Sequence, residues 1–221
     1  MSYFIKDFIK FFKDLEKNNS KEWFDANRKR YETSVKKPFY HFLDEMIGRI
    51  NALDSDVRIQ AKDAVMRINR DIRFSPDKTP YNLHYGGIIS AAGRKDKTVP
   101  GIFLRFTANE IGILGGAHGI DKDQLQKVRM AIASDLKGFQ QLISRKAFKE
   151  KFGEILGDKH KRIPKEFQAA FEKQPLIANK AFYYMAQLPP KYITDSNLAD
   201  IIMEHWKVAR PVNEFLIKAM K

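Results

Sequence analysis

The 221-residue sequence contains no cysteine, and this absence excludes four classes of site at once. Without a thiol the chain has no disulfide scaffold, thiolate zinc site, iron–sulfur cluster or cysteine nucleophile. The sequence also lacks an apolar run of roughly 18 residues, the length that a membrane-spanning helix needs. The histidines, at positions 41, 84, 118, 160 and 205, show no paired metal-ligand spacing. We therefore predict no metal site and no membrane partner.

The N-terminal segment has no uninterrupted hydrophobic stretch of the kind found in secretory signal peptides, because charged side chains divide its aromatic residues. We expect a cytoplasmic protein. Hydrophobic residues make up 43% of the chain and charged residues 30%, as in ordinary globular proteins. At this length we predict one domain over residues 1–221, and the sequence leaves the oligomeric state open.

The formal net charge is +13, which favours anionic partners without choosing among them. The positive excess lies mainly in residues 61–100 and 121–165. The first of these regions is rich in loops, whereas the second has helical spacing. They are therefore candidates for two different kinds of site.

The first quarter of the chain predicts three helical segments. Apolar residues recur with helical spacing from Phe4 to Leu15. Asn19 and Glu22 have the spacing of a capping box that begins a second segment, and a third follows Pro38. Later helices are predicted from Asp121, which has Gln124 at its third position, and at 139–156, 166–173, 195–207 and 211–220.

Between these helical regions the pattern favours short strands. Apolar residues alternate from residue 62, and further apolar runs lie at 88–92, 101–107 and 110–114. The connections are short and rich in turn residues, which favours antiparallel pairing of consecutive strands. We predict an α+β fold in which a central antiparallel sheet of about four strands, residues 62–115, is packed by N-terminal and C-terminal helices.

The densest chemistry lies in residues 67–81, RINRDIRFSPDKTPY. Two prolines favour a rigid turn there, and guanidinium groups pair readily with phosphate, sulfate or carboxylate. The predicted ligand-binding residues are Arg67, Arg70, Arg73, Lys78, Tyr81 and His84. Asp71 is a candidate general base, with Ser75 and Asp77 as secondary catalytic candidates. A magnesium ion on the two aspartates is disfavoured because the cations compete for the same oxygens.

The same motif has a purely structural alternative. Asp71 and Asp77 can lock the neighbouring arginines into a salt-bridge network that ties the loop to the fold. In that case at least one of the two carboxylates accepts hydrogen bonds from a neighbouring arginine or backbone N–H. The sequence does not decide between binding and structure.

Several motifs together resemble one known family. They are Phe12-x-x-Leu15-x-x-Asn18-Asn19-x-x-x-Trp23-Phe24, the residues 67–81 motif, Gly115-Gly116 before a helix with Arg129, and Lys161-Arg162-x-Pro164-Lys165. The chain resembles bacterial conserved hypothetical proteins of the family known as domain of unknown function 2461. Ala117-His118 and Glu166 depart from the family pattern. The resemblance implies a fold and a motif, and it implies no activity or cofactor.

The leading functional hypothesis is therefore binding, with turnover left open, of an anionic or phosphorylated small molecule at the residues 67–81 motif. A second hypothesis is a nucleic-acid-associated module that uses the basic helical stretch from Arg145 to Lys165. Phe148 and Phe152 lie within that stretch, but their helical spacing also fits a buried stripe. The third hypothesis is that the central motif is only structural.

Overall fold

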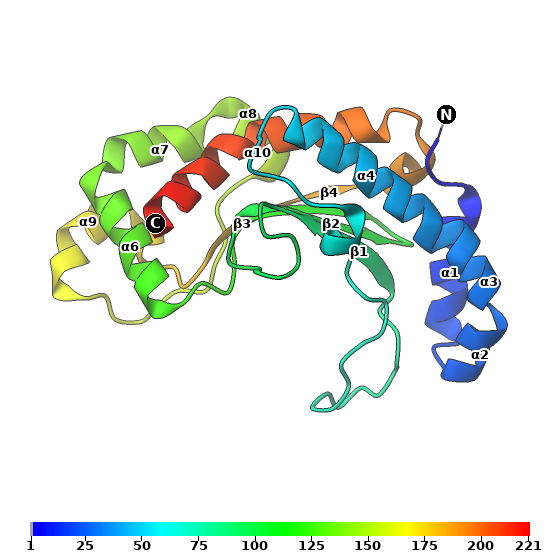
Figure 1. The fold of residues 1–221 in the computed structure, drawn as a ribbon. Coiled ribbons are helices and arrows are strands. Elements are labelled where there is room, and N and C mark those ends of the chain that lie inside the picture. The colour runs from blue at the N-terminus through cyan, green and yellow to red at the C-terminus, as the bar shows by residue number, and fades with distance from the viewer. Residues whose placement is uncertain (1) are drawn as a thin grey trace. The chain divides into compact units, whose positions relative to one another are not determined.

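The computed structural model describes residues 2–221, and Figure 1 shows its helices and strands. The helices are α1 (Lys6–Lys17), α2 (Lys21–Ala26), α3 (Arg28–Tyr31), α4 (Lys37–Asn51), α5 (Ala61–Ala64), α6 (Lys122–Ser134), α7 (Leu136–Ser144), α8 (Lys146–Phe152), α9 (Gln168–Lys173) and α10 (Leu198–Met220). The strands are β1 (His84–Ile89), β2 (Gly101–Thr107), β3 (Ile111–Ala117) and β4 (Phe182–Leu188). Within the described part of the chain, none of the helices has both the length and the apolarity that crossing a bilayer requires.

The four strands form one antiparallel sheet in the order β1-β2-β3-β4. Consecutive strands are therefore neighbours, as the short, turn-rich connections predicted. In β2, buried and half-exposed residues alternate along the whole strand, so one face of β2 is covered while the other remains accessible. The predicted α+β class and the antiparallel sheet are confirmed.

The predicted positions of the strands are wrong in three places. The strand predicted at 88–92 is β1, which begins four residues earlier and ends at Ile89. Residues 61–64 form the short helix α5 instead of a strand, because Gln60 and Asp63 satisfy each other's backbone N–H groups in a capping box. The residues directly after α5 form two isolated antiparallel bridges, Val65 with Gly87 and Asn69 with Tyr81. The fourth strand is β4, which lies far outside residues 62–115.

Three predicted helix boundaries also differ. The N-cap of α2 is Ser20 instead of Asn19, because the Ser20 side chain accepts from the Trp23 N–H. The predicted helix at 139–156 is broken at Arg145 into α7 and α8. The two predicted C-terminal helices are one helix, α10, with Pro211 inside it. Buried apolar neighbours of Pro211, including Val212, hold this helix by packing.

Contacts between residues divide the chain into two compact units. The first unit consists of three segments: the chain up to Lys95, Phe103–Ile113 and Gln187–Met203. Its core is aromatic: the Phe106 ring of β2 has ring contacts with Phe4, Phe8, Phe39 and Phe42 of the N-terminal helical region. These side chains are almost fully buried, so the apolar stripe predicted from sequence is the helical side of this core.

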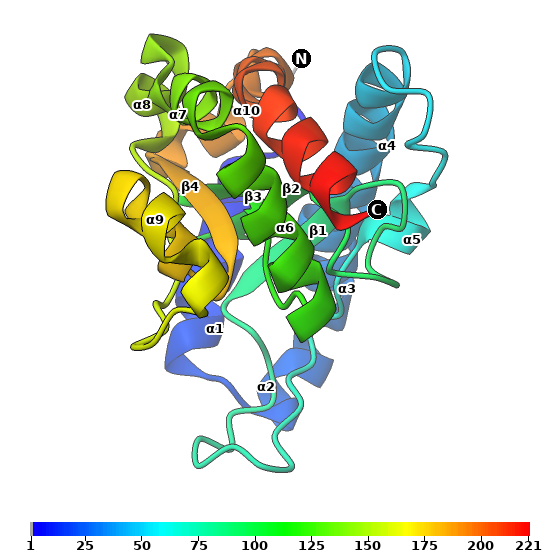
Figure 2. The same ribbon diagram turned by 90° about the vertical axis from the view of Figure 1, so that its left-hand side faces the viewer.

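The second unit contains Asp96–Ile102, Leu114–Ala186 and Glu204–Lys221. Helix α6 begins with the predicted capping box, in which the Asp121 side chain accepts from the Gln124 N–H. Figure 2 shows α6 beside α9 in this unit. The buried Arg129 of α6 donates to the Ile177 carbonyl at 2.8 Å, which ties the helix to the turn after α9. The prediction of a single domain over residues 1–221 stays a prediction.

Candidate functional site

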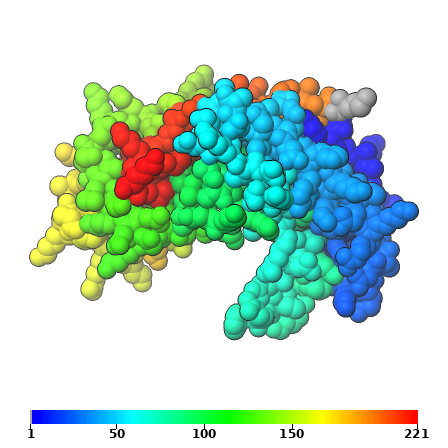
Figure 3. All heavy atoms as spheres, viewed as in Figure 1, coloured from blue at the N-terminus to red at the C-terminus, as the bar shows by residue number. Residues whose placement is uncertain are grey.

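The segment 67–81, called the motif loop below, projects from the surface of the first unit (Figure 3). Its two arms are joined near the base by the Asn69–Tyr81 bridge. The Arg70 N–H donates to the Pro80 carbonyl and the Asn82 N–H donates to the Ile68 carbonyl, each at 2.8 Å. The motif loop is therefore a hairpin-like finger that is held at its base by backbone hydrogen bonds.

Helix α2 and the residues before it hold one arm of the finger. The Asn19 side chain accepts from the Tyr81 N–H at 3.1 Å and donates to the Tyr81 carbonyl at 2.9 Å. The Tyr81 ring stacks on Phe24 with ring centroids 4.0 Å apart. Burial raises the pKa of the Tyr81 hydroxyl. The structure thus places Tyr81 in the core as an anchor, and its role in ligand binding stays a prediction.

Arg70 organises the interior of the motif loop. Its guanidinium donates to Asp77 at 2.5 Å, to the Thr79 carbonyl at 3.1 Å and to the Thr79 hydroxyl. A longer contact of 3.4 Å reaches the Ser75 hydroxyl. Asp77 in turn accepts from the Thr79 N–H at 2.9 Å and from the Thr79 hydroxyl at 3.0 Å. These contacts join the two sides of the turn, and the rigidity expected from its two prolines stays a prediction.

Asp71 occupies a different place in the same loop. It accepts two hydrogen bonds from the Arg73 guanidinium, at 2.9 and 2.7 Å, and Arg67 lies 3.9 Å away. The prediction that Asp71 or Asp77 accepts hydrogen bonds from a neighbouring arginine or backbone N–H is confirmed for both residues.

The same contacts weaken both carboxylates as bases. The Arg73 side chain lowers the pKa of Asp71, and the Thr79 N–H, with Arg70, lowers that of Asp77 to about 2. A carboxylate that is stabilised in its charged form accepts a proton less readily. The catalytic roles of Asp71, Ser75 and Asp77 stay predictions, and the proposal below does not use them.

The outer surface of the motif loop differs from its interior. The side chains of Arg67 and Arg73 are 66% and 76% exposed, and Phe74 is 93% exposed. The Arg73 guanidinium lies 5.9 Å from the centre of the Phe74 ring. Lys78 is exposed and donates only to the Ile72 carbonyl in the described structure. Three cations and one aromatic ring are therefore available to a partner.

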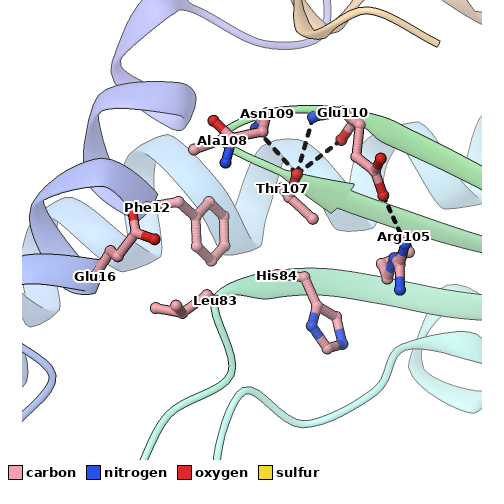
Figure 4. Close-up of a pocket in the computed structure, with 9 residues that line it drawn as sticks. All are labelled: Phe12, Glu16, Leu83, His84, Arg105, Thr107, Ala108, Asn109 and Glu110. Carbon is pink, nitrogen blue, oxygen red and sulfur yellow. Dashed lines mark hydrogen bonds and ion pairs between the residues drawn. The ribbon is translucent and has the colours of Figure 1, made fainter. Parts of the chain in front are cut away.

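His84, the last of the predicted ligand residues, lies outside the motif loop at the start of β1. It lines a pocket of about 400 Å³ together with Arg105 and Glu110 (Figure 4). Burial and the nearby Arg105 charge lower the pKa of His84, which favours the neutral imidazole. Residues 67–81 are not among the residues that line this pocket, and the role of His84 in ligand binding at the motif loop stays a prediction.

The second basic region is less available than its sequence indicates. Phe148 and Phe152 are buried, as their helical spacing allowed. Lys151 lies 3.5 Å from Glu204, and Lys146 lies 3.8 Å from Glu150. Its aromatic residues are thus unavailable for stacking on bases, and nucleic-acid binding at this stretch stays a prediction.

Sequence reasoning missed two residues that the structure makes prominent. Phe74 belongs to the predicted motif without a predicted role, although a phenylalanine between an arginine and a serine in a proline-containing turn is a signal for exposure. Arg105 lies on the accessible face of β2, where other residues are also half-exposed, so its sequence pattern does not distinguish it. It lies near His84 because β1 pairs with β2. Within residues 2–221 no group of three or more potential metal ligands is positioned to hold an ion.

Comparisons with known proteins point in one direction. The family model described as conserved hypothetical protein (DUF2461) matches residues 7–215, which is nearly the whole chain. A search of curated proteins finds no match. The match includes both the motif loop and the His84 pocket, and it attaches no activity to either.

Proposed function

The chain belongs to the DUF2461 family of conserved hypothetical proteins, and we propose that it binds anionic ligands through the motif loop. The proposed ligand is a phosphate group next to an aromatic base, the unit that free nucleotides and single-stranded nucleic acids share. The observation that carries the proposal is the exposed Phe74 ring, flanked by the exposed guanidinium of Arg73 on a loop that has hydrogen bonds across its interior.

The cations of the motif loop differ in what they contact, and this difference supports the proposal. The Arg70 guanidinium donates its hydrogen bonds to groups inside the loop, so Arg70 maintains the shape of the finger. Arg67, Arg73 and Lys78 keep donors on the outside, where phosphate oxygens can reach them. A guanidinium that is already held by Asp71 loses little freedom on binding, which favours affinity.

Phe74 selects the kind of anion. An exposed ring offers a surface on which a nucleobase stacks, and base–aromatic stacking contributes about 1–3 kcal/mol per base. Inorganic phosphate and sulfate gain nothing from the ring. Because the motif loop is a projecting finger, we favour a flexible strand, which can wrap around a convex surface, over a free nucleotide.

The test is fluorescence anisotropy with a labelled single-stranded oligonucleotide over a range of salt concentrations. We expect Phe74→Ala to weaken binding about 5-fold to 150-fold at every salt concentration, as loss of one stacked base predicts. Arg73→Ala should reduce the slope of log affinity against log salt by about 0.7, the value for one phosphate of a single strand. Competition with a free mononucleotide distinguishes the two sources of the ligand.

Matched controls lie elsewhere on the chain. Met130→Ala removes another exposed apolar side chain, and Arg94→Ala removes another exposed arginine. Both variants should bind as the wild type does. If Lys149→Ala lowers the salt slope while Arg73→Ala leaves it unchanged, binding uses the basic stretch from Arg145 to Lys165 instead. Equal binding by Phe74→Ala and the wild type contradicts the stacking role.

A further inference from the structure

The pocket beside His84 is a second, separate feature of the first unit. Its lining comes from α1, from β1 and the residue before it, and from β2 with the turn that leads to β3 (Figure 4). At about 400 Å³ it has the size of a small-molecule site. The motif-loop proposal makes no use of it.

The pocket has an apolar end and a polar end. Phe12, Leu83 and Ala108 lie at one end, and His84, Arg105 and Glu110 lie at the other. Glu16 stands on the apolar side and is exposed to solvent. A ligand that fits this division has an apolar body and one compact polar group.

Arg105 is the strongest polar group at that end, and its position is fixed by a chain of hydrogen bonds. Its guanidinium donates to one Glu110 oxygen at 2.6 Å, and the Gln187 side chain donates to the other Glu110 oxygen at 2.8 Å. Both carboxylate oxygens therefore have donors. Glu110 acts as a support that orients Arg105, and the pocket receives a guanidinium that is held in place.

The Arg105 guanidinium has N–H donors that its bond to Glu110 does not use. Within residues 2–221 the bond to Glu110 is the hydrogen bond found for Arg105, and the side chain is 32% exposed. Its terminal nitrogens therefore keep N–H donors that an acceptor in the pocket can reach. A planar acceptor with two oxygens matches the fork of a guanidinium.

His84 completes the polar end. Its imidazole comes from the neighbouring strand, and the described residues give it no hydrogen-bond partner. A neutral imidazole has one N–H donor, and a bound carboxylate can accept from it. Two groups on adjacent strands thus face one small space, one of them charged and the other neutral.

We propose that this pocket binds a small carboxylate with an apolar body. The carboxylate is held by the Arg105 guanidinium and the His84 imidazole, and the apolar body lies against Leu83 and Phe12. The hydrogen bonds of Glu110 to Arg105 and Gln187 hold the guanidinium in place, so that a ligand meets Arg105 in a fixed position.

Benzoate and benzamide are the probes, because they share a ring and differ in charge. Titration of the wild-type protein is followed by NMR of the histidine ring signals, with the His84 signal assigned from His84→Gln. We expect benzoate to shift the His84 signal more than those of the other histidines and to raise its pKa. Benzamide should bind about tenfold more weakly or worse, because it offers no negative charge.

Two substitutions separate this site from general surface binding. Arg105→Gln should weaken benzoate binding about tenfold or more, and Arg105→Lys, which keeps the charge beside Glu110, should also weaken it because the fork is lost. Arg49→Gln, which removes another surface arginine paired with carboxylates, should leave binding unchanged.

Three results would each overturn the proposal. They are an unshifted His84 signal at the highest soluble benzoate concentration, equal binding of benzamide and benzoate, and wild-type affinity in a folded Arg105 variant. Thermal melting of each variant shows whether it is folded, and Arg105→Lys keeps the test available if Arg105→Gln is not. Oligonucleotide binding by the motif loop is measured separately, so either proposal can fail alone.

Discussion

Asn213 of α10 provides the sharpest test of how the second unit is held together. Its side-chain oxygen accepts from the Tyr184 hydroxyl at 2.7 Å and from the Gly116 N–H at 3.1 Å. Its side-chain nitrogen donates to the Gly101 carbonyl at 3.0 Å. One amide thus joins α10 to residues of three strands, and only 6% of Asn213 is exposed.

Replacing Asn213 by leucine keeps the number and branching of the side-chain heavy atoms and removes all three hydrogen bonds. Each buried partner that is left unpaired costs about 1–3 kcal/mol. The Tyr184 hydroxyl is fully enclosed, whereas Gly116 and Gly101 are half-exposed and recover part of the loss from water. We expect the free energy of unfolding to fall by about 3–5 kcal/mol, which is a large share of the 5–15 kcal/mol typical of a domain.

Urea denaturation followed by circular dichroism measures this change. Tyr184→Phe should cost less, about 1 kcal/mol, because it removes one bond and leaves the amide with its other two. In the double variant the Tyr184 hydroxyl no longer lacks a partner, so its loss of stability should be smaller than the sum of the single losses by about 1–2 kcal/mol. A loss below about 1 kcal/mol for Asn213→Leu, with an unchanged m-value, refutes the reasoning.

Two further predictions concern the motif loop. Asn19→Ala removes both hydrogen bonds to the Tyr81 backbone and should lower the free energy of unfolding by about 1–3 kcal/mol, measured in urea; the adjacent Asn18→Ala, which removes an exposed bond to Asp14, should cost less. The lowered pKa of Asp77 means that its contribution to loop order is complete above its ordinary pKa of 3.8 and disappears as the pH falls through about 2. The amide NMR signal of Thr79 should therefore titrate near pH 2, and a midpoint near 4 would contradict the hydrogen bonds assigned to Asp77.

The helices were the most predictable part of the fold, and the reason is local. The stripe from Phe4 to Leu15 and the Asp121–Gln124 capping box each depend on neighbours within a few residues. Both were found where they were predicted. The break at Arg145 and the continuity of α10 through Pro211 depend on packing against other segments, which helical spacing does not contain.

The antiparallel character of the sheet was predictable, but the set of segments that form its strands was not. Strand β4 alternates buried and accessible residues over Phe182–Ala186, yet it stands among helices in the sequence. Its partner, β3, lies more than sixty positions earlier in the chain, and no local pattern specifies such pairing. The residues after α5 show the opposite case, since their apolar alternation leads to isolated bridges and no strand.

The three arginines of the motif loop have different environments that the sequence does not reveal. In the sequence, Arg67, Arg70 and Arg73 are three equivalent cations at a spacing of three residues. The structure assigns Arg70 to the interior of the loop and leaves the other two largely exposed. Because the exposed pair can reach phosphates, substituting Arg67 or Arg73 should change the salt dependence of binding, whereas substituting Arg70 should change the order of the loop first.

That difference makes a family motif testable residue by residue. Arg70→Lys keeps the charge but removes the planar guanidinium, whose Nη1 donates to Asp77 and to the Thr79 carbonyl while its Nη2 reaches the Ser75 hydroxyl. If the motif loop binds by shape and stacking, this variant should lose affinity and the order of the Thr79 amide together, with the salt slope unchanged. If net charge alone attracts the ligand, the variant should bind as the wild type does, and the rigid finger is then not needed for recognition.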